Sequence, residues 1–423
     1  MYTSIIESFS NSIRALRYYI ESVEFKSFTT MDAENAHAFL AMIMYLSKEL
    51  KIHNGDVDDL EFPEEFSTDM VDAIKESMRR MESVFDISQD GKSGRYPRMP
   101  KTLKEYYRVV EATAKQNEIL YSGALLLLIT YFENTISKIL KEDFQRHPQR
   151  MSLENKTVPY RILEKSESIE DVKAVLIEEE VTSIMYKSLS DWIDYFKKNI
   201  KLKLEYVTQV LPEMKEVVAR RNIIVHNEGV VNTIYLNSVS ELMRPNVKRG
   251  DTLRVDKSYI INAVDLVENV GMSLIIEMWI NDFGQAEDQI QEIVDVIFDE
   301  YLIFEKWDSA SILYDICLKS KKLNAADELM CKINRWQCYK WQGRFEQVKA
   351  DVEKQDVSIC SPMYRLGMLA LLDKYEEFFD LYENQNEIGE EQLSTWPLFR
   401  GIRECDVYKE KYGEDCVCIE ESH

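Results

Sequence analysis

Apolar residues recur every three or four positions along most of this chain, and this spacing predicts amphipathic helices. The longest such run extends from residue 101 to about 144, with Gly123 as its one soft interruption. Helix breakers are scarce, at 13 glycines and 9 prolines in 423 residues. The pattern therefore predicts an all-α fold. The apolar stripe of the long run consists of Leu125, Leu128, Ile129, Phe132, Ile136, Ile139 and Leu140.

Changes in this pattern divide the chain into four parts. Residues 1–87 are expected to form an N-terminal helical domain. Residues 88–100 concentrate Gly, Pro, Ser and charged side chains, which is typical of an exposed linker. A second helical domain is expected over 101–286, and shorter helices separated by turns are expected over 287–423. Within the N-terminal domain, helices are expected at 2–23, 33–50 and 68–85.

One predicted helix ends near Gly229 and carries an unusual polar cluster. Arg221 falls on the apolar stripe of this helix, where a guanidinium needs a carboxylate or a phosphate as its partner. Asn222 and His226 are four residues apart and so share the flank beside the stripe. Gly229 supplies the left-handed residue that ends a helix. The stripe consists of Val210, Leu211, Met214, Val217, Val218, Ile224 and Val225.

The ten residues 220–229 have the sequence Arg-Arg-Asn-Ile-Ile-Val-His-Asn-Glu-Gly. A helix through them brings a fixed positive charge, a side-chain amide and a titrating imidazole within reach of one another. We therefore expect chemistry at the end of this helix.

The spacing Arg221-Asn222-x-x-x-His226 resembles the Arg-x4–6-His motif of HEPN-domain ribonucleases, in its Arg-Asn-x-x-x-His form. The resemblance covers about the middle third of the chain. It extends to the following Asn227-Glu228-Gly229, to a predicted long helix over 256–282 and to an earlier helix that carries Glu133. It implies a four-helix domain and a metal-independent endoribonuclease. In that reaction the RNA 2′-hydroxyl attacks its own phosphodiester and leaves a 2′,3′-cyclic phosphate and a 5′-hydroxyl.

The resemblance also implies roles for the residues of the motif. His226 is expected to be the general acid or base, Arg221 the clamp on the phosphorane oxygens and Asn222 an orienting amide. Glu133 is the expected partner of Arg221, and the alternative is an ion pair that only orients two helices. Arg220 is a second candidate clamp. Because one His does not easily serve as both acid and base, a homodimer with a shared cleft is expected.

Two short β-branched segments, 230–236 and 252–255, are expected to pair as a small β-hairpin inserted before the 256–282 helix. Basic residues in or beside this insert are the candidates for holding RNA phosphates. The candidates in or beside the insert are Arg244, Lys248, Arg249 and Arg254, and Arg220 of the preceding helix is a further candidate.

The C-terminal part contains turns at 322–326, 343–346 and 373–376 that resemble the turn-plus-aromatic entries of tetratricopeptide-type hairpins. Successive turns begin 21 and 30 residues apart, so the 34-residue period is not kept. We expect a degenerate helical-repeat domain, and stacks of this kind usually bind protein. A protein partner or inhibitor is therefore expected here.

The charge distribution modifies the picture of an RNA-binding protein. The net charge is −23, and residues 351–423 contain 18 Asp and Glu against 7 Lys and Arg. Residues 201–257 contain 10 Lys and Arg against 7 Asp and Glu, so the motif lies in a locally basic segment. This arrangement disfavours indiscriminate RNA binding and suggests a selected or switched substrate.

Other classes of chemistry find little support in the sequence. The seven cysteines all follow residue 316 and are irregularly spaced, which favours reduced thiols over a disulfide framework. With five histidines and no paired ligand motif, no metal or cofactor is expected. No apolar run reaches eighteen residues and the first residues lack the features of a signal peptide, so we expect a cytoplasmic protein without a membrane segment.

For biological role, the resemblance implies a regulated toxin or an anti-phage defence effector. Two alternatives stay open. The same fold without catalysis would be a helical scaffold or protein-interaction module, in which Arg221 and His226 are structural. The chain would otherwise be a toxin partner that a separate nucleotidyl-transferring enzyme modifies.

Overall fold

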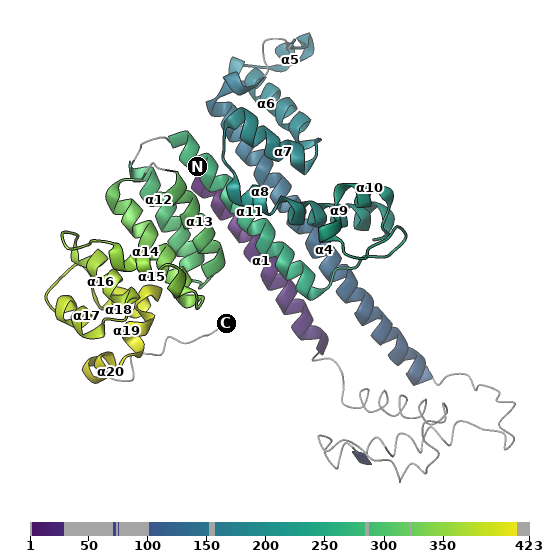
Figure 1. The fold of residues 1–423 in the computed structure, drawn as a ribbon. Coiled ribbons are helices and arrows are strands. Elements are labelled where there is room, and N and C mark those ends of the chain that lie inside the picture. The colour runs from purple at the N-terminus through teal and green to yellow at the C-terminus, as the bar shows by residue number, and fades with distance from the viewer. Residues whose placement is uncertain are drawn as a thin grey trace. The chain divides into compact units, whose positions relative to one another are not determined.

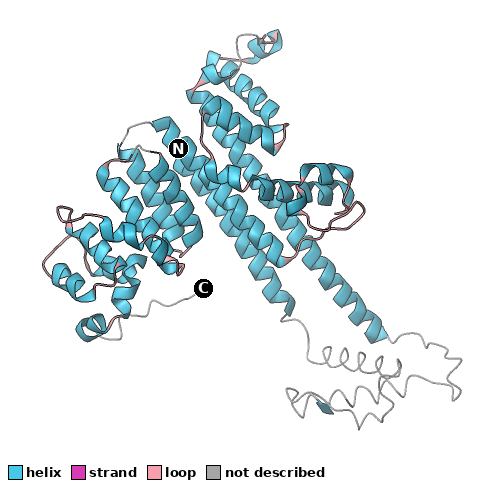
Figure 2. Cartoon of the chain, in the orientation of Figure 1, coloured by secondary structure: helices cyan, strands magenta, loops and turns pink. Residues whose placement is uncertain are grey.

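The computed structural model describes residues 2–28, 71, 72, 75, 101–151, 157–283, 287–320 and 323–412, which form helices joined by loops and turns (Figure 2). Within these ranges no strand occurs, and one isolated antiparallel bridge joins Val230 to Thr252. The all-α prediction is confirmed. The predicted helix 33–50 and the predicted linker 88–100 lie outside the described residues, as does most of the predicted helix 68–85.

The chain forms two compact units, and three long helices contribute residues to both. These helices are α1 (Tyr2–Phe28), α4 (Lys101–Arg146) and α11 (Lys257–Phe283) (Figure 1). The first unit contains 1–14, 127–253 and 262–423, and the second contains 15–126 and 254–261. The domain boundaries expected near residues 100 and 286 stay predictions.

Two of these helices are long and apolar enough to cross a membrane by length and composition, over Lys115–Arg146 and Lys257–Asp282. In the most apolar window of each, 50% and 72% of the residues are buried inside the protein. The central helix of a soluble core has the same composition. The predicted stripe of α4 is buried, with Leu125, Leu128, Phe132 and Ile136 all at 0% exposure.

Helix α1 approaches α11 closely inside the first unit. A Cβ atom on Gly271 would lie 2.5 Å from the Phe9 ring, so the contact depends on a glycine at this position. Further along the same pair, the Tyr2 ring stacks on Trp279 with 5.8 Å between centroids. The two helices therefore form one side-by-side pair in the core of this unit.

A series of shorter helices follows α4. The helix that begins at Leu189 passes into a π-helical turn at Phe196, and the helical conformation stops at Lys201, which has a φ of 72°. Leu204 is also left-handed, with a φ of 50°. The elements are η2 (Pro148–Arg150), α5 (Tyr160–Lys165), α6 (Ile169–Met185), α7 (Leu189–Tyr195), η4 (Phe196–Ile200), α8 (Glu205–Gln209), α9 (Leu211–Asn227), α10 (Thr233–Ser238) and η5 (Glu241–Met243).

The C-terminal region is built from packed helical pairs. Helix α13 packs along α14, α14 packs on α16, and α16 packs on α17 (Figure 1). The short helices separated by turns that were expected here are present in the structure. Their relation to tetratricopeptide repeats stays a prediction. The elements are α12 (Glu287–Ile297), η6 (Phe298–Leu302), α13 (Trp307–Lys319), α14 (Ala325–Trp341), η7 (Phe345–Gln347), α15 (Lys349–Lys354), α16 (Pro362–Leu371), α17 (Tyr375–Tyr382), α18 (Glu390–Thr395), η8 (Pro397–Phe399), α19 (Arg400–Glu404) and α20 (Asp406–Tyr412).

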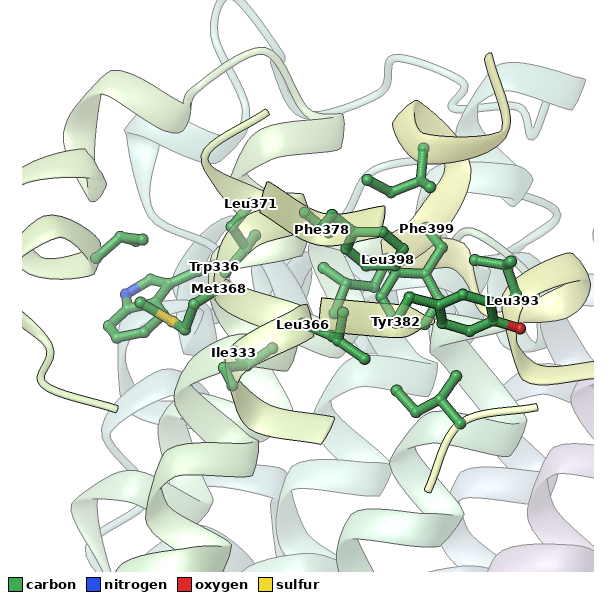
Figure 3. Close-up of a cluster of buried hydrophobic side chains, with 14 of the residues drawn as sticks. Ile333, Trp336, Leu366, Met368, Leu371, Phe378, Tyr382, Leu393, Leu398 and Phe399 are labelled. Carbon is green, nitrogen blue, oxygen red and sulfur yellow. The ribbon is translucent and has the colours of Figure 1, made fainter. Parts of the chain in front are cut away.

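An aromatic cluster forms the core of these C-terminal helices (Figure 3). Phe378 lies at its centre, stacked on Tyr382 at 6.0 Å and edge-to-face with Phe399 at 5.2 Å. Trp336 is 4% exposed and belongs to the same cluster. These aromatic side chains are therefore used for packing.

Candidate functional site

Helix α9 carries the Arg-Asn-x-x-x-His motif and ends at Asn227, with Glu228 as its left-handed cap one residue before the predicted Gly229. Glu228 and Gly229 both adopt left-handed conformations, with φ of 52° and 78°. The Gly229 N–H donates to the Ile223 carbonyl at 3.0 Å, which satisfies a carbonyl of the last turn. A Cβ atom on Gly229 would lie 2.7 Å from the Leu253 carbonyl oxygen. Glycine is therefore needed here for both its conformation and its size.

The predicted apolar stripe of α9 is correct in its first turns and wrong in its last turn. Met214 and Val217 are buried, but Val225 is 46% exposed and Ile223 takes its place at 3%. The reason is that α10 folds against the other side of α9. Its contacts with α9 form a small core of Ala219, Ile223, Val231, Tyr235 and Val239.

Arg221 and Glu133 form the ion pair that the sequence predicted, between α9 and α4. The Arg221 Nη2 donates to Glu133 Oε1. The Arg221 side chain is 19% exposed and that of Glu133 is 34% exposed, so the pair lies at the surface of the unit. The Arg221 Nε is buried without an acceptor among the described residues. One edge of the guanidinium is thus fixed by the protein.

Arg220, the second candidate clamp, is engaged in a separate network. Its Nε donates to Glu216 Oε1 at 2.8 Å, and the Tyr235 hydroxyl donates to the same oxygen at 2.9 Å. Glu216 is 6% exposed and Tyr235 is 1% exposed. Burial, with the negative charge of Glu216, raises the pKa of Tyr235 to about 12. This network joins α9 to α10, so Arg220 has a structural partner, and sequence reasoning missed both Glu216 and Tyr235.

Asn222 and His226 are exposed on one flank of α9, four residues apart, as the helical spacing predicted. In the part of the chain that the structure describes, neither side chain makes a hydrogen bond or an ion pair. His226 is in the last turn of the helix. Its imidazole is open to water and accessible to a ligand.

The expected β-hairpin after Gly229 is wrong, because the first of its two segments passes into helix and the insert contains two short helical elements. Residues 233–238 form α10 and residues 241–243 form η5. The Asn232 side chain accepts the Tyr235 N–H at 2.9 Å and so caps α10. Only the two ends of the insert, residues 229–231 and 250–253, lie paired, at the Val230–Thr252 bridge. These two segments are called the neck of the insert.

The neck of the insert is closed by backbone hydrogen bonds next to the end of α9. Val231 donates to the Asp251 carbonyl at 2.8 Å, and Gly250 donates to the Val231 carbonyl at 2.9 Å. Leu253 donates to the Gly229 carbonyl at 2.9 Å. The insert is therefore a closed loop whose two ends meet directly after the motif.

The predicted phosphate contacts are not equally placed. Lys248 and Arg249 are exposed in the insert. The Arg244 Nε donates to the Val239 carbonyl at 2.9 Å, so this guanidinium helps to hold the insert together. Arg254 is exposed and belongs to the second compact unit. Lys248, Arg249 and Arg254 therefore stay candidates for phosphate contacts, whereas Arg244 has a structural partner.

A pocket of about 430 Å³ lies between α4 and α6. Glu133 lines it, together with Lys141 and Glu178. Lys141 and Glu178 form an ion pair there at 3.8 Å. Glu133 therefore binds Arg221 while also facing this pocket, which sequence reasoning did not identify.

Comparisons of the chain with protein-family models, curated proteins and solved structures give no match. The functional interpretation of the site therefore depends on the motif residues and on the geometry described above.

Proposed function

We propose that this chain is a HEPN-type endoribonuclease that cleaves RNA by metal-independent transesterification. The observation that carries the proposal is the arrangement on α9: Arg221 is fixed by Glu133, and His226 is exposed near the helix end. A fixed guanidinium and an accessible imidazole are the two groups that this reaction requires.

In the proposed reaction, the RNA 2′-oxygen forms a bond to phosphorus and the bond from phosphorus to the 5′-oxygen breaks. The proton of the 2′-hydroxyl passes to a base, and the leaving 5′-oxygen receives a proton from an acid. His226 serves one of these roles in each chain. Arg221 stabilises the negative charge on the non-bridging oxygens, and Asn222 orients the phosphate.

A homodimer follows from this chemistry, because two proton transfers need two titrating groups. Each protomer supplies one His226, and the second histidine of a cleft comes from the partner. Lys248 and Arg249 are proposed to hold the flanking phosphates. We also propose a cytoplasmic location and a role as a regulated toxin or anti-phage effector.

The decisive experiment is RNA cleavage by the full chain in the presence of a metal chelator. His226→Ala is expected to lower the cleavage rate by about 100-fold or more, because it removes the proton-transfer group. Asn237→Ala, at an exposed residue of α10, is the matched control for surface substitution and retains activity. Product ends are identified by mass spectrometry as 2′,3′-cyclic phosphate and 5′-hydroxyl. Cleavage that survives in His226→Ala contradicts the proposal.

The competing function is a catalytically inactive helical scaffold or protein-interaction module. The observation that favours it is that Arg220 and Arg221 both have carboxylate partners within the chain. Under this alternative the wild-type chain cuts no RNA, and Arg221→Gln changes stability alone. RNA cleavage by the wild-type chain would exclude this alternative.

A further inference from the structure

Three metal-ligating side chains converge where α4 and α11 end, away from the motif on α9. Asp143 lies in the last turn of α4, His147 follows the end of that helix, and Asp282 is next to the last residue of α11. One ligand atom from each residue lies within 4.8 Å of the other two. The His147 Nε2 and the Asp282 Oδ1 are 3.4 Å apart.

Both carboxylates are buried, and each has one oxygen without a hydrogen-bond donor. The Asp143 side chain is 0% exposed and that of Asp282 is 1% exposed. Asp143 Oδ2 and Asp282 Oδ1 make no hydrogen bond in the described part of the chain. Leaving a buried carboxylate oxygen without such a bond is costly unless something else binds it.

The other oxygen of each carboxylate is held by a protein donor. Arg150 Nη1 donates to Asp143 Oδ1, and the Tyr2 hydroxyl donates to Asp282 Oδ2. In metal sites, outer donors of this kind orient ligating carboxylates and leave the second oxygen for the ion. Each of the two aspartates therefore has one oxygen held by a protein donor and one oxygen left without a donor.

We infer that Asp143, His147 and Asp282 bind a divalent metal ion, with zinc as the ion that this ligand set suits best. One imidazole nitrogen and two carboxylate oxygens are donors that zinc accepts, and a water molecule would complete a tetrahedral site. Ligands at zinc distances lie about 3.4 Å apart in a tetrahedron. The separation of His147 Nε2 and Asp282 Oδ1 fits this value.

The surroundings also favour a cation. Asp143 and Asp282 lie in the last turns of their helices, where the exposed carbonyl groups carry partial negative charge. The His147 side chain is 30% exposed, which gives an ion a path to the site.

This site departs from the expectation that the chain has no metal. The sequence did not indicate it because Asp282 is 135 residues beyond His147 and only the fold brings them together. A bound ion would join the ends of α4 and α11 and so stabilise the folded state. The inference is independent of the proposed ribonuclease function, because it concerns binding and not cleavage.

The test is a zinc titration of the tag-free full chain after removal of metals with a chelator. Isothermal calorimetry is expected to show one site with a dissociation constant of about 1 μM or tighter. Zinc is also expected to raise the melting temperature by about 3 °C or more. His147→Gln and Asp282→Asn are each expected to weaken zinc binding about 100-fold.

His226→Gln is the matched control, since it removes an exposed imidazole outside the site and is expected to bind zinc like the wild type. Circular dichroism verifies the fold of each variant. Cobalt absorption of the wild type gives a second measurement that needs no variant, with a tetrahedral spectrum and no thiolate charge-transfer band. The inference is overturned if the wild type binds no zinc, if His147→Gln and Asp282→Asn bind it unchanged, or if the cobalt spectrum shows thiolate ligands.

Discussion

At the scale of single residues, the Arg221 Nη2 is held by Glu133, and the Arg221 side chain is 19% exposed. This geometry suits a group that must meet a phosphate without moving. A partly exposed ion pair contributes modestly to stability, so its removal should affect the proposed reaction more than the fold.

Glu133→Gln tests this role. We expect kcat to fall by about tenfold or more with a smaller change in KM, because the guanidinium loses its fixed orientation. The measurement is steady-state RNA cleavage with parallel thermal melts. Glu142→Gln, which breaks the Arg146 pair on the same helix, is the control and should leave kcat unchanged. Equal kcat in Glu133→Gln and the wild type would exclude a positioning role.

Gly229→Ala tests the helix end. The change adds a Cβ atom 2.7 Å from the Leu253 carbonyl oxygen and places alanine at a φ of 78°. We expect the free energy of unfolding to fall by about 1–3 kcal/mol, measured by urea denaturation. Gly250→Ala has a φ of 94° but open space around the Cβ, so it carries the conformational cost alone. Equal losses in the two variants would show that the close approach has no effect.

Some residue-level features were accessible from the sequence and others were not. The Arg221–Glu133 pair was predicted because a guanidinium on an apolar stripe needs a carboxylate. The Gly229 helix end followed from ordinary capping rules. The engagement of Arg220 was not predicted, because its partner network includes Tyr235 from a helix that the sequence did not indicate.

At the scale of elements, the α1–α11 contact depends on the small size of Gly271. Gly271→Ala is expected to destabilise the protein by about 1–3 kcal/mol, because the new methyl group meets the Phe9 ring. In a Phe9→Leu background the cost should shrink, and a double-mutant cycle of urea unfolding measures this coupling. Gly123→Ala is the control. Its Cβ meets nothing within 4 Å, so it should be neutral or stabilising.

Glu277 of α11 gives a prediction for pH. Its Oε2 accepts the backbone N–H groups of Lys203 and Leu204 at 3.1 and 3.0 Å. Burial raises the pKa of Glu277 above its usual value of 4.5, although these N–H groups lower it. The folded chain therefore binds this proton more tightly than the unfolded chain. The stability that this proton contributes is present below pH 4.5 and is lost as pH rises through the raised pKa.

Glu277→Gln removes this dependence. We expect the stability of the variant relative to the wild type to increase from about pH 4 to pH 7, measured by urea unfolding at several pH values. A constant difference over this range would show that Glu277 has the same pKa in the folded and unfolded chains. Glu205→Gln, at an exposed carboxylate whose pKa is lowered by a hydrogen bond from Lys319, should show the opposite trend.

The failure of the hairpin prediction also belongs to this scale. The β-branched residues of 230–236 favour a strand, but Asn232 caps a helix and Tyr235 is buried against α9. Local capping and burial therefore outweighed strand propensity. The long apolar helices α4 and α11 were predicted well, because their periodicity extends over many turns.

At the scale of the whole molecule, the cysteines are free thiols in the described residues, and three of them are buried. A hydrogen bond with Cys317 and burial raise the pKa of Cys331, and burial raises that of Cys338. We expect Cys317, Cys331 and Cys338 to resist a thiol reagent in the folded protein and to react after denaturation. The melting temperature should not change with reductant. A lower melting temperature in reductant would indicate a disulfide.

The organisation of the molecule was only partly accessible from the sequence. Short helices in the C-terminal region were predicted from its turns and aromatic residues. The convergence of Asp143 and His147 with Asp282 was not predictable, because no local pattern connects residues so far apart. Contacts of this kind arise from tertiary packing alone.

The closed neck after Gly229 has a practical consequence. Since the two ends of the insert are pinned together, foreign sequence placed in its exposed turn, between Pro245 and Asn246, would leave the chain entering and leaving at the same points. An epitope or a small fluorescent module grafted there would mark the insert that follows the motif helix from within the chain itself.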